Sequence, residues 1–153
     1  MRVPGRIRIQ WEDDDTLRLD TDAGMQTRHF RFGPSDASPP EPSWQGESAS
    51  EWQVPRGRGR GGPAPPPQTG SLKVVTTNMR AGYLRKNGVP YSDRATLTEY
   101  FNVVRHRSGE EWFVVTSVVD DPEYLRQPFH TSTQFRRQAD ETGWNPTPCS
   151  SIW

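Results

Sequence analysis

Two long strand-like runs, residues 95–106 and 111–119, constrain the fold more than any other feature of the sequence. Both runs are rich in β-branched and aromatic residues, and Ser108-Gly109 between them is a turn signal typical of a hairpin. Apolar residues at helical spacing appear nowhere over a useful length. The sequence therefore predicts an all-β fold, an antiparallel meander that forms an open barrel or sandwich and leaves few strand edges exposed.

The turn also predicts how these two strands align. With Ser108 and Gly109 at the centre of the turn, the expected cross-strand pairs are Glu99 with Val118, Phe101 with Thr116, and Val103 with Val114. Alternation along the first strand places Leu97, Glu99 and Phe101 on one face.

Three other regions carry strand patterns. Residues 6–32 predict strand, turn and strand, with the acidic residues 12–15 as a solvated turn. Residues 71–79 form a run rich in β-branched side chains, and residues 129–137 alternate apolar with polar side chains. Together these regions provide enough strands for one small sheet, and the length of 153 residues fits a single domain.

Residues 33–70 interrupt the strand pattern with clustered Pro and Gly, and they predict a long insert. The apolar fraction of the whole chain is 31%, against about 45–50% in globular chains, and this segment holds most of the deficit. We expect residues 43–54 to dock on the fold through Trp44 and residues 55–69 to be mobile. Residues 138–153 predict a loose C-terminal tail.

Glu99 is the foremost candidate functional residue, because it shares a face with apolar neighbours. If that face is the core, the carboxylate loses hydration and either meets an Arg or His partner or has a raised pKa. It could then act as an acid or base, or as a polar anchor in a ligand cavity. In the alternative interpretation the opposite face, with Tyr100 and Val104, is buried, and Glu99 faces water.

A second candidate site surrounds the hairpin signal Asn87-Gly88. The aromatic and basic residues near it are Arg80, Tyr83, Arg85, Tyr91 and Arg94. Such a cluster can bind anions or carboxylates through bidentate guanidinium contacts, or it can simply decorate a hairpin.

Other sequence features exclude several kinds of site. The single cysteine, Cys149, excludes an internal disulfide and a cysteine-based zinc site, and the spacing of the three histidines matches no metal motif. No nucleophile elbow, phosphate-binding loop or dinucleotide motif occurs, so we predict no cofactor and no metal. Residues 56–62 resemble a short RGG element, but the net charge of the chain is zero, which makes a nucleic-acid partner unlikely. No apolar run is long enough for a membrane span or a signal-peptide core.

Several short stretches occur in a suggestive order: Pro4-Gly5-Arg6-Ile7, residues 42–48 (PSWQGES), residues 98–101 (TEYF) and residues 121–125 (DPEYL), followed by Gln127-Pro128-Phe129. Together they resemble an uncharacterised family of exported bacterial β-rich proteins. The resemblance implies one domain, a docked Trp44 segment and a periplasmic or secreted location, and it carries no assigned activity and no catalytic residues. Members of that family usually have a signal peptide and a further N-terminal stretch. If that stretch supplies strands, this domain has an open sheet edge through which it could form a homodimer.

These observations favour a non-catalytic, extracytoplasmic β-barrel-like module. We expect it to bind a small or extended ligand at the Glu99 face or at the hairpin of residues 80–91, with Trp44 contributing. One alternative is a hydrolase or isomerase that uses Glu99 with a nearby His, which a cavity beside Glu99 with a His in hydrogen-bond reach would favour. Another is an accessory or RNA-binding protein that acts through the Arg-Gly segment, which a filled core would favour.

Overall fold

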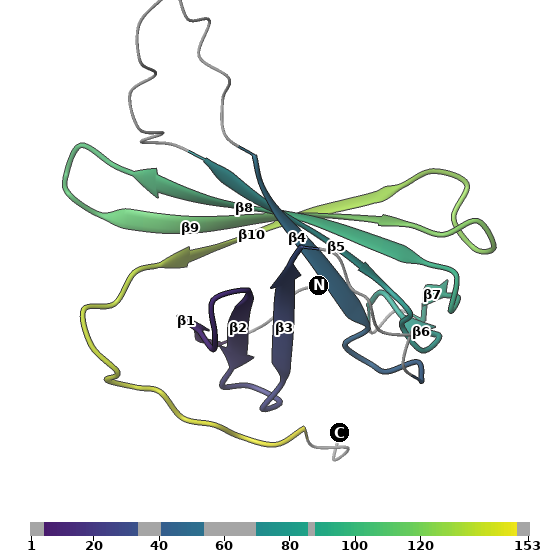
Figure 1. Cartoon of the computed structure of the whole chain (residues 1–153), viewed down its shortest axis with the longest axis horizontal. Helices are drawn as coiled ribbons and strands as arrows, with labels where there is room; N and C mark the ends of the chain where they lie inside the picture. Colours follow the sequence, from purple (N-terminus) through teal and green to yellow (C-terminus); the bar gives the residue numbers. More distant parts are fainter. Residues whose placement is uncertain (1–4, 34–40, 54–69, 86–87, 150–153) are drawn as a thin grey trace, which may run out of the picture.

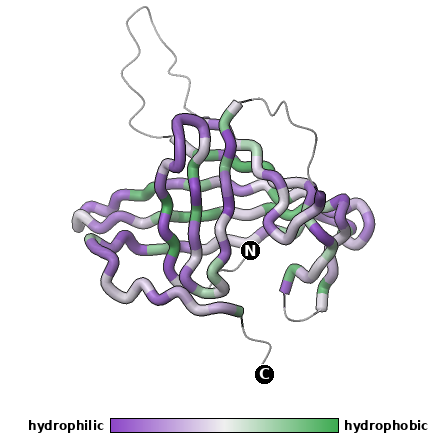
Figure 2. The backbone as a smooth tube through the Cα atoms, turned by 60° about the horizontal axis from the view of Figure 1, so that its bottom comes forward, coloured by the Kyte–Doolittle hydropathy of each residue, from purple (hydrophilic) through white to green (hydrophobic). Residues whose placement is uncertain are grey.

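The computed structural model describes residues 5–33, 41–53, 70–85 and 88–149, and these residues form ten strands and no helix. The strands are β1 (Ile7–Trp11), β2 (Thr16–Thr21), β3 (Thr27–Phe32), β4 (Glu47–Gln53), β5 (Ser71–Thr77), β6 (Gly82–Tyr83), β7 (Pro90–Tyr91), β8 (Thr96–Arg105), β9 (Glu111–Asp120) and β10 (Phe129–Arg136). Hydrophobic and hydrophilic residues alternate along them, as Figure 2 shows, because successive side chains point to opposite faces.

Eight of the strands form one sheet in the order β1-β2-β3-β4-β5-β8-β9-β10, and β6 pairs with β7 in a small separate hairpin. The sheet coils so that β8, β9 and β10 cross over β1, β2 and β3, which gives an open half-barrel (Figure 1). The predicted all-β fold with an open barrel is therefore confirmed. The edge strands of the sheet are β1 and β10, and dimerisation through an open edge stays a prediction.

The sheet departs from a simple meander at β4. This strand lies within the segment predicted to be an insert, where it pairs in parallel with β3 and antiparallel with β5. A parallel pair needs a crossover connection in place of a tight turn, and residues 33–46 provide it. Residues 33–70, predicted to be an insert from their Pro- and Gly-rich composition, therefore include a strand of the main sheet. Residues 55–69, predicted to be mobile, lie outside the described residues.

The β8–β9 hairpin differs from its predicted alignment by one residue. The observed pairs are Glu99 with Ser117, Phe101 with Val115, and Val103 with Phe113. The backbone N–H of His106 donates to the Glu110 carbonyl at 2.8 Å, and Gly109, with φ +88°, occupies the left-handed region. The turn is thus a three-residue loop closed by a left-handed glycine, not a two-residue turn. A shift of one residue exchanges the two faces of β9, so the strand presents Val115 and Ser117, not Val114 and Val118, to the interior.

The barrel interior contains two groups of buried apolar side chains. The larger group lies between the two halves of the coiled sheet and comprises Leu17, Leu19, Phe30, Leu72, Val74, Phe101 and Val115. The smaller group lies near the β6–β7 hairpin and comprises Met79, Ala95, Leu97 and Val119. Leu97 and Phe101 therefore belong to the core, and the face that carries Glu99 is the buried one.

The described part of the C-terminal tail is attached to the barrel, contrary to the prediction of a loose end. The backbone N–H of Thr147 donates to the Asp22 carbonyl at 2.9 Å, and the N–H of Gly24 donates to the Thr147 carbonyl at 2.8 Å. Nearer the start of the tail, Arg8 of β1 pairs with Glu141 at 2.9 Å and lies over the ring of Trp144. Figure 1 shows the tail passing beside β1, β2 and β3 after it leaves β10.

Candidate ligand-binding site

A cavity of about 290 Å³ opens at one end of the barrel interior, where β1, β4, β8 and β9 present their last inward-facing residues. Its walls are formed by Ile9, Gln10, Trp11, Leu17, Phe30, Trp52, Gly70, Leu72, Phe101, Val103 and Phe113. We call this cavity the aromatic mouth. Gln10 is opposite Arg18 on the outer face of the sheet, and the inward-facing side chains among the described lining residues are apolar and uncharged.

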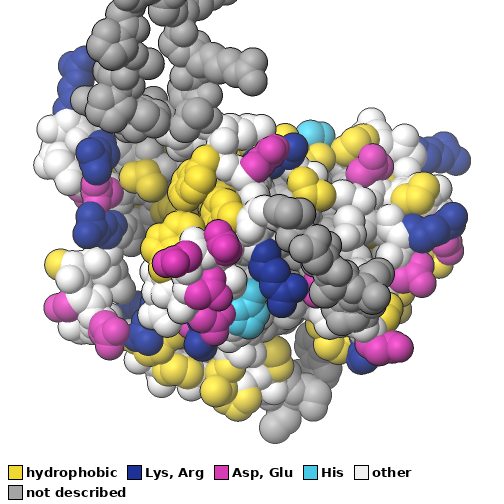
Figure 3. All heavy atoms as spheres, in the orientation of Figure 1, with side chains coloured by type: hydrophobic (Ala, Val, Ile, Leu, Met, Phe, Trp, Pro, Cys, Tyr) yellow, Lys and Arg dark blue, Asp and Glu magenta, His cyan; other side chains and the backbone are white. Residues whose placement is uncertain are grey.

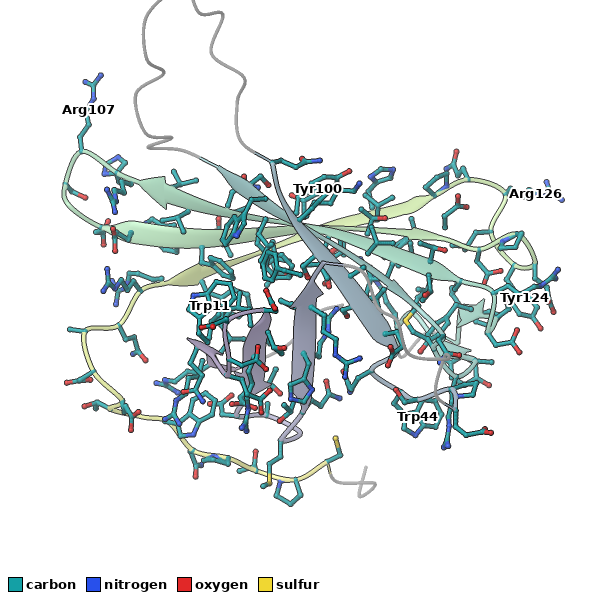
Figure 4. The ribbon with its side chains drawn as sticks, in the orientation of Figure 1. Trp11, Trp44, Tyr100, Arg107, Tyr124 and Arg126 are labelled. Carbon is teal, nitrogen blue, oxygen red and sulfur yellow. The ribbon has the colours of Figure 1, made fainter. Side chains whose placement is uncertain are left out.

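Aromatic rings form the rim of this cavity. The Phe32 ring lies 5.8 Å from the Trp52 ring, nearly parallel to it, and 5.4 Å from the Trp11 ring. Trp11 is 52% exposed and Trp52 is 54% exposed, although both side chains belong to the inward-facing set of their strands. Figure 3 shows hydrophobic side chains gathered on this face beside a group of acidic ones, and Figure 4 labels Trp11. Grouped, half-exposed aromatic side chains of this kind mark binding surfaces more often than isolated ones do.

The floor of the aromatic mouth is a layer of buried side chains. Phe30 and Phe101 are fully or almost fully buried, with ring centroids 5.3 Å apart, and Leu17 and Leu72 complete the layer. This packed layer separates the mouth from the polar side chains deeper in the barrel.

Glu99 lies beneath this floor and is 2% exposed. Its Oε2 atom lies 2.7 Å from Nη1 of Arg28, and its Oε1 atom accepts a hydrogen bond from the Ser117 hydroxyl at 3.1 Å. Because Oε2 has no well-aligned hydrogen bond among the described residues, its contact with Arg28 is chiefly electrostatic. Of the two environments expected for a buried Glu99, the structure shows the one with an arginine partner.

Arg28 connects this ion pair to a chain of hydroxyl groups. It is 7% exposed, and its Nη2 donates to Thr76 Oγ1 at 3.1 Å, which in turn is 2.8 Å from Ser48 Oγ. A small cavity of about 30 Å³ adjoins Arg28 and Glu99, enough for one or two water molecules. The arrangement is a closed polar network that binds β3, β4, β5, β8 and β9 together.

The histidines lie away from Glu99. His29 pairs with Glu12 at 3.2 Å, His106 contacts Ser108 at 2.8 Å in the β8–β9 loop, and His130 is exposed on β10. Among the described residues, the side chains that contact the Glu99 carboxylate are Arg28 and Ser117, so the geometry does not provide the Glu–His pair of the enzyme interpretation. The same part of the chain holds no group of three His, Cys, Asp or Glu side chains placed to bind a metal.

The basic residues near the β6–β7 hairpin are each used in a separate contact. Arg80 donates through Nε to the Pro42 carbonyl at 2.8 Å, Arg85 lies over the ring of Phe129, and Arg94 pairs with Glu123 at 2.9 Å. These contacts direct the guanidinium groups toward different neighbours, so they do not converge on one anion.

The two tyrosines of the hairpin also differ from each other. Tyr83 is exposed, whereas Tyr91 is half-buried and its ring lies against Gly82, where a Cβ would meet the ring at about 3 Å. Burial raises the pKa of the Tyr91 hydroxyl. The cluster predicted around this hairpin therefore consists of local packing contacts in the described residues.

Trp44 does not cover the sheet, contrary to prediction. Its side chain is 59% exposed, and its ring lies 5.9 Å from the Arg80 guanidinium. Its segment is attached through the backbone instead, by a bridge between Ser43 and Met79. Figure 4 shows Trp44 near the β6–β7 end of the molecule, far from Trp11.

Asp121, at the end of β9, is a buried carboxylate whose role the sequence did not indicate. It accepts hydrogen bonds from the backbone N–H groups of Ser92, Glu123 and Tyr124 and from the Ser92 hydroxyl. Burial acts to raise the pKa of Asp121, but these hydrogen bonds outweigh it and hold the pKa below its ordinary value. Asp121 thus fixes the loop after β9 to the loop before β8.

No family model, curated protein or solved structure matches the chain. In the described part of the chain, no helix is long and apolar enough to cross a membrane. The resemblance to exported bacterial β-rich proteins stays a prediction, and the function has to be inferred from the geometry of the cavities.

Proposed function

We propose that the protein is a non-catalytic binding module that takes a small, uncharged ligand with an aromatic or apolar ring into the aromatic mouth. The observation that carries this proposal is an apolar cavity of about 290 Å³ whose rim consists of half-exposed tryptophans. Mouths of β-barrels are common ligand sites, and such pockets typically measure about 300–1,000 Å³. The cavity is at the lower end of this range, which favours a small molecule over a long-chain lipid.

The chemistry of the lining supports an uncharged ligand. Burying a charge in this cavity would cost solvation without an opposite charge to compensate for it. The rings of Trp11 and Trp52 provide faces for stacking. The described residues of the lining include neither a nucleophile nor an acid–base pair, which favours binding over catalysis.

A titration with the neutral fluorescent probe N-phenyl-1-naphthylamine tests this proposal. We expect saturable fluorescence enhancement that changes little with salt concentration, because the contacts are apolar. Trp11→Ala and Trp52→Ala should each weaken binding by about tenfold, since an aromatic contact at an interface contributes on the order of 1–2 kcal/mol.

Trp44→Ala is the matched control, because Trp44 is as exposed as the other two tryptophans but lies outside the cavity. Its affinity for the probe should equal that of the parent protein. Equal losses in all three variants, or no saturable signal in the parent protein, would contradict the proposal.

A further inference from the structure

A second cavity, of about 150 Å³, lies where β3 and β4 separate. Its lining includes Arg28, His29, Arg31, Gln45, Glu47 and Ser48, and in contrast to the aromatic mouth it is mostly polar. We call it the seam pocket.

The seam pocket exists because the parallel pairing of β3 with β4 is short. The two strands are aligned only from Phe30 with Ser48 to Phe32 with Ser50. Before that point the chain turns away from β3 at Gly46, which has φ +63° and packs so closely on the Thr77 carbonyl that a Cβ there would clash. The described residues leave the space beside the first half of β3 unfilled as a result.

Arg28 gives the seam pocket a buried positive charge. This side chain lines both the seam pocket and the small cavity beside Glu99. A guanidinium has five N–H donors, and among the described residues the contacts of Arg28 use Nη1 for Glu99 and Nη2 for Thr76. Arg28 therefore retains donor capacity for a further acceptor in the pocket.

The pocket is lined by two arginines, each of which has a carboxylate partner. Arg31 and Glu47 pair loosely, at 3.4 Å, and Arg31 is exposed. Arg28 is balanced by Glu99 and Arg31 by Glu47, so guanidinium N–H donors, and not a net charge of the lining, would attract an anion. An oxyanion between the strands could accept a hydrogen bond from Arg28, on the inner face of β3, and Arg31, on the outer face, would add attraction, because its loose pairing would cost little to rearrange.

One further group restricts the ligand. The side-chain oxygen of Gln45 is buried and has no hydrogen-bond partner among the described residues. A buried acceptor of this kind is costly to leave unpaired, so a ligand that brings a hydrogen-bond donor gains affinity. We infer that the seam pocket binds a small oxyanion that also carries a donor, such as a hydroxycarboxylate or hydrogen phosphate.

Amide chemical shifts of the whole protein, recorded by NMR at constant ionic strength, test this inference. The probes are lactate, inorganic phosphate and propionate, which resembles lactate but lacks the hydroxyl group. We expect saturable shifts at residues 27–31 and 45–48 with lactate or phosphate, and weaker binding of propionate. Equal affinity for lactate and propionate would overturn the role of Gln45, and an absence of saturable shifts with all three probes would overturn the site.

Two variants of the loose ion pair test the charge argument in opposite directions. Arg31→Gln should weaken anion binding and Glu47→Gln should tighten it, each by up to about fivefold, as expected for partly exposed charges. Lys73→Gln and Glu51→Gln are matched controls, because they remove the charges of a surface pair that joins β4 to β5 outside the pocket. Control variants that change the affinity as much as Arg31→Gln and Glu47→Gln would show general charge attraction and overturn the site.

Discussion

The aromatic mouth and the polar end of the barrel interior around Arg28 and Glu99, which we call the closed end, share five strands but have opposite chemistry. On each strand an inward-facing apolar residue at the aromatic mouth lies four positions from an inward-facing polar residue at the closed end: Phe32 and Arg28 on β3, Trp52 and Ser48 on β4, Leu72 and Thr76 on β5, Val103 and Glu99 on β8, and Phe113 and Ser117 on β9. Four residues along a strand correspond to about 13 Å.

The contrast in chemistry gives the two ends different roles: the closed end contributes to stability, and the mouth offers surface for binding. At the closed end, the charges and hydroxyls contact one another and are buried. At the mouth, Trp11, Trp52 and Val103 remain more than half exposed, which leaves apolar surface that a ligand could cover. We therefore expect substitutions at the closed end to affect folding and substitutions at the mouth to affect binding.

The largest effect should follow from breaking the buried ion pair. Glu99→Gln leaves Arg28 charged and buried without a counter-charge, and we expect a loss of about 3–5 kcal/mol in the free energy of unfolding, measured by urea denaturation. Replacing both partners, as Arg28→Met with Glu99→Leu, should cost less than the single change, because a buried pair can be exchanged for apolar side chains.

The control for this experiment is Glu51→Gln, which breaks the more exposed pair with Lys73 and should cost less than about 1 kcal/mol. If Glu99→Gln proved as mild as Glu51→Gln, the closed end would not be the stabilising end of the barrel.

A smaller effect is expected at Asp121, a buried carboxylate with hydrogen bonds in place of a charge partner. Asp121→Asn should lower the free energy of unfolding by about 2 kcal/mol at neutral pH, since hydrogen bonds to a charged group contribute about 1.5–3 kcal/mol. The pKa of Asp121 is lowered in the folded state, so its contribution is complete above the unfolded pKa of about 3.9 and is lost as the pH falls through the folded pKa.

Urea denaturation of parent and variant between pH 7 and pH 2.5 measures this contribution. The difference between the two proteins should be constant above about pH 5 and shrink below about pH 4. A difference that is independent of pH over this range would mean that the charge of Asp121 does not contribute.

The attachment of the C-terminal tail should have a still smaller effect. Thr147→Pro removes the N–H that donates to the Asp22 carbonyl, and we expect a loss of about 1 kcal/mol. Thr147→Ala retains the N–H and is the control. Identical melting temperatures for these two variants would show that the tail does not stabilise the barrel.

The smallest effects on stability should come from the tryptophans of the mouth. Because each remains half-exposed, Trp11→Ser and Trp52→Ser should change the free energy of unfolding by no more than about 1 kcal/mol, although they remove the binding surface. A loss of about 3 kcal/mol in either variant would place that tryptophan in the core and remove the contrast between the two ends.

The sequence predicted the fold class well because alternation over long strands is a local signal. The positions of β8, β9 and β10 follow from their β-branched and aromatic residues. The β8–β9 register was wrong because the loop type depends on the left-handed conformation of Gly109, and a sequence with one glycine near the turn is compatible with more than one loop. Because of this shift of one residue, the predicted pairing placed Val118 opposite Glu99, whereas the structure places Ser117 there as its hydrogen-bond partner.

The candidate site was less predictable because it depends on contacts between distant parts of the chain. Glu99 was found from its strand, but its partner Arg28 comes from β3. Alternation places Arg28 on the same face as Phe30 and Phe32, but no local signal indicates that this face of β3 lies against β8. Trp52 was placed in the insert because clustered Pro and Gly around it hide the strand β4. Alternation within residues 47–53 is the signal that could have found it.

The short parallel alignment of β3 with β4 has a consequence for how the molecule opens. β1, β2 and β3 are joined by local turns, and β4 pairs with β5 along its whole length, so the β3–β4 boundary joins two units that are each more extensively paired internally. In native-state hydrogen exchange, we expect the backbone amides that join β3 to β4 to exchange sooner than those between β8 and β9, through a partial opening in which the first three strands move away together. Because Arg28 belongs to β3 and Glu99 to β8, each such opening would also separate the buried charges and admit water between them.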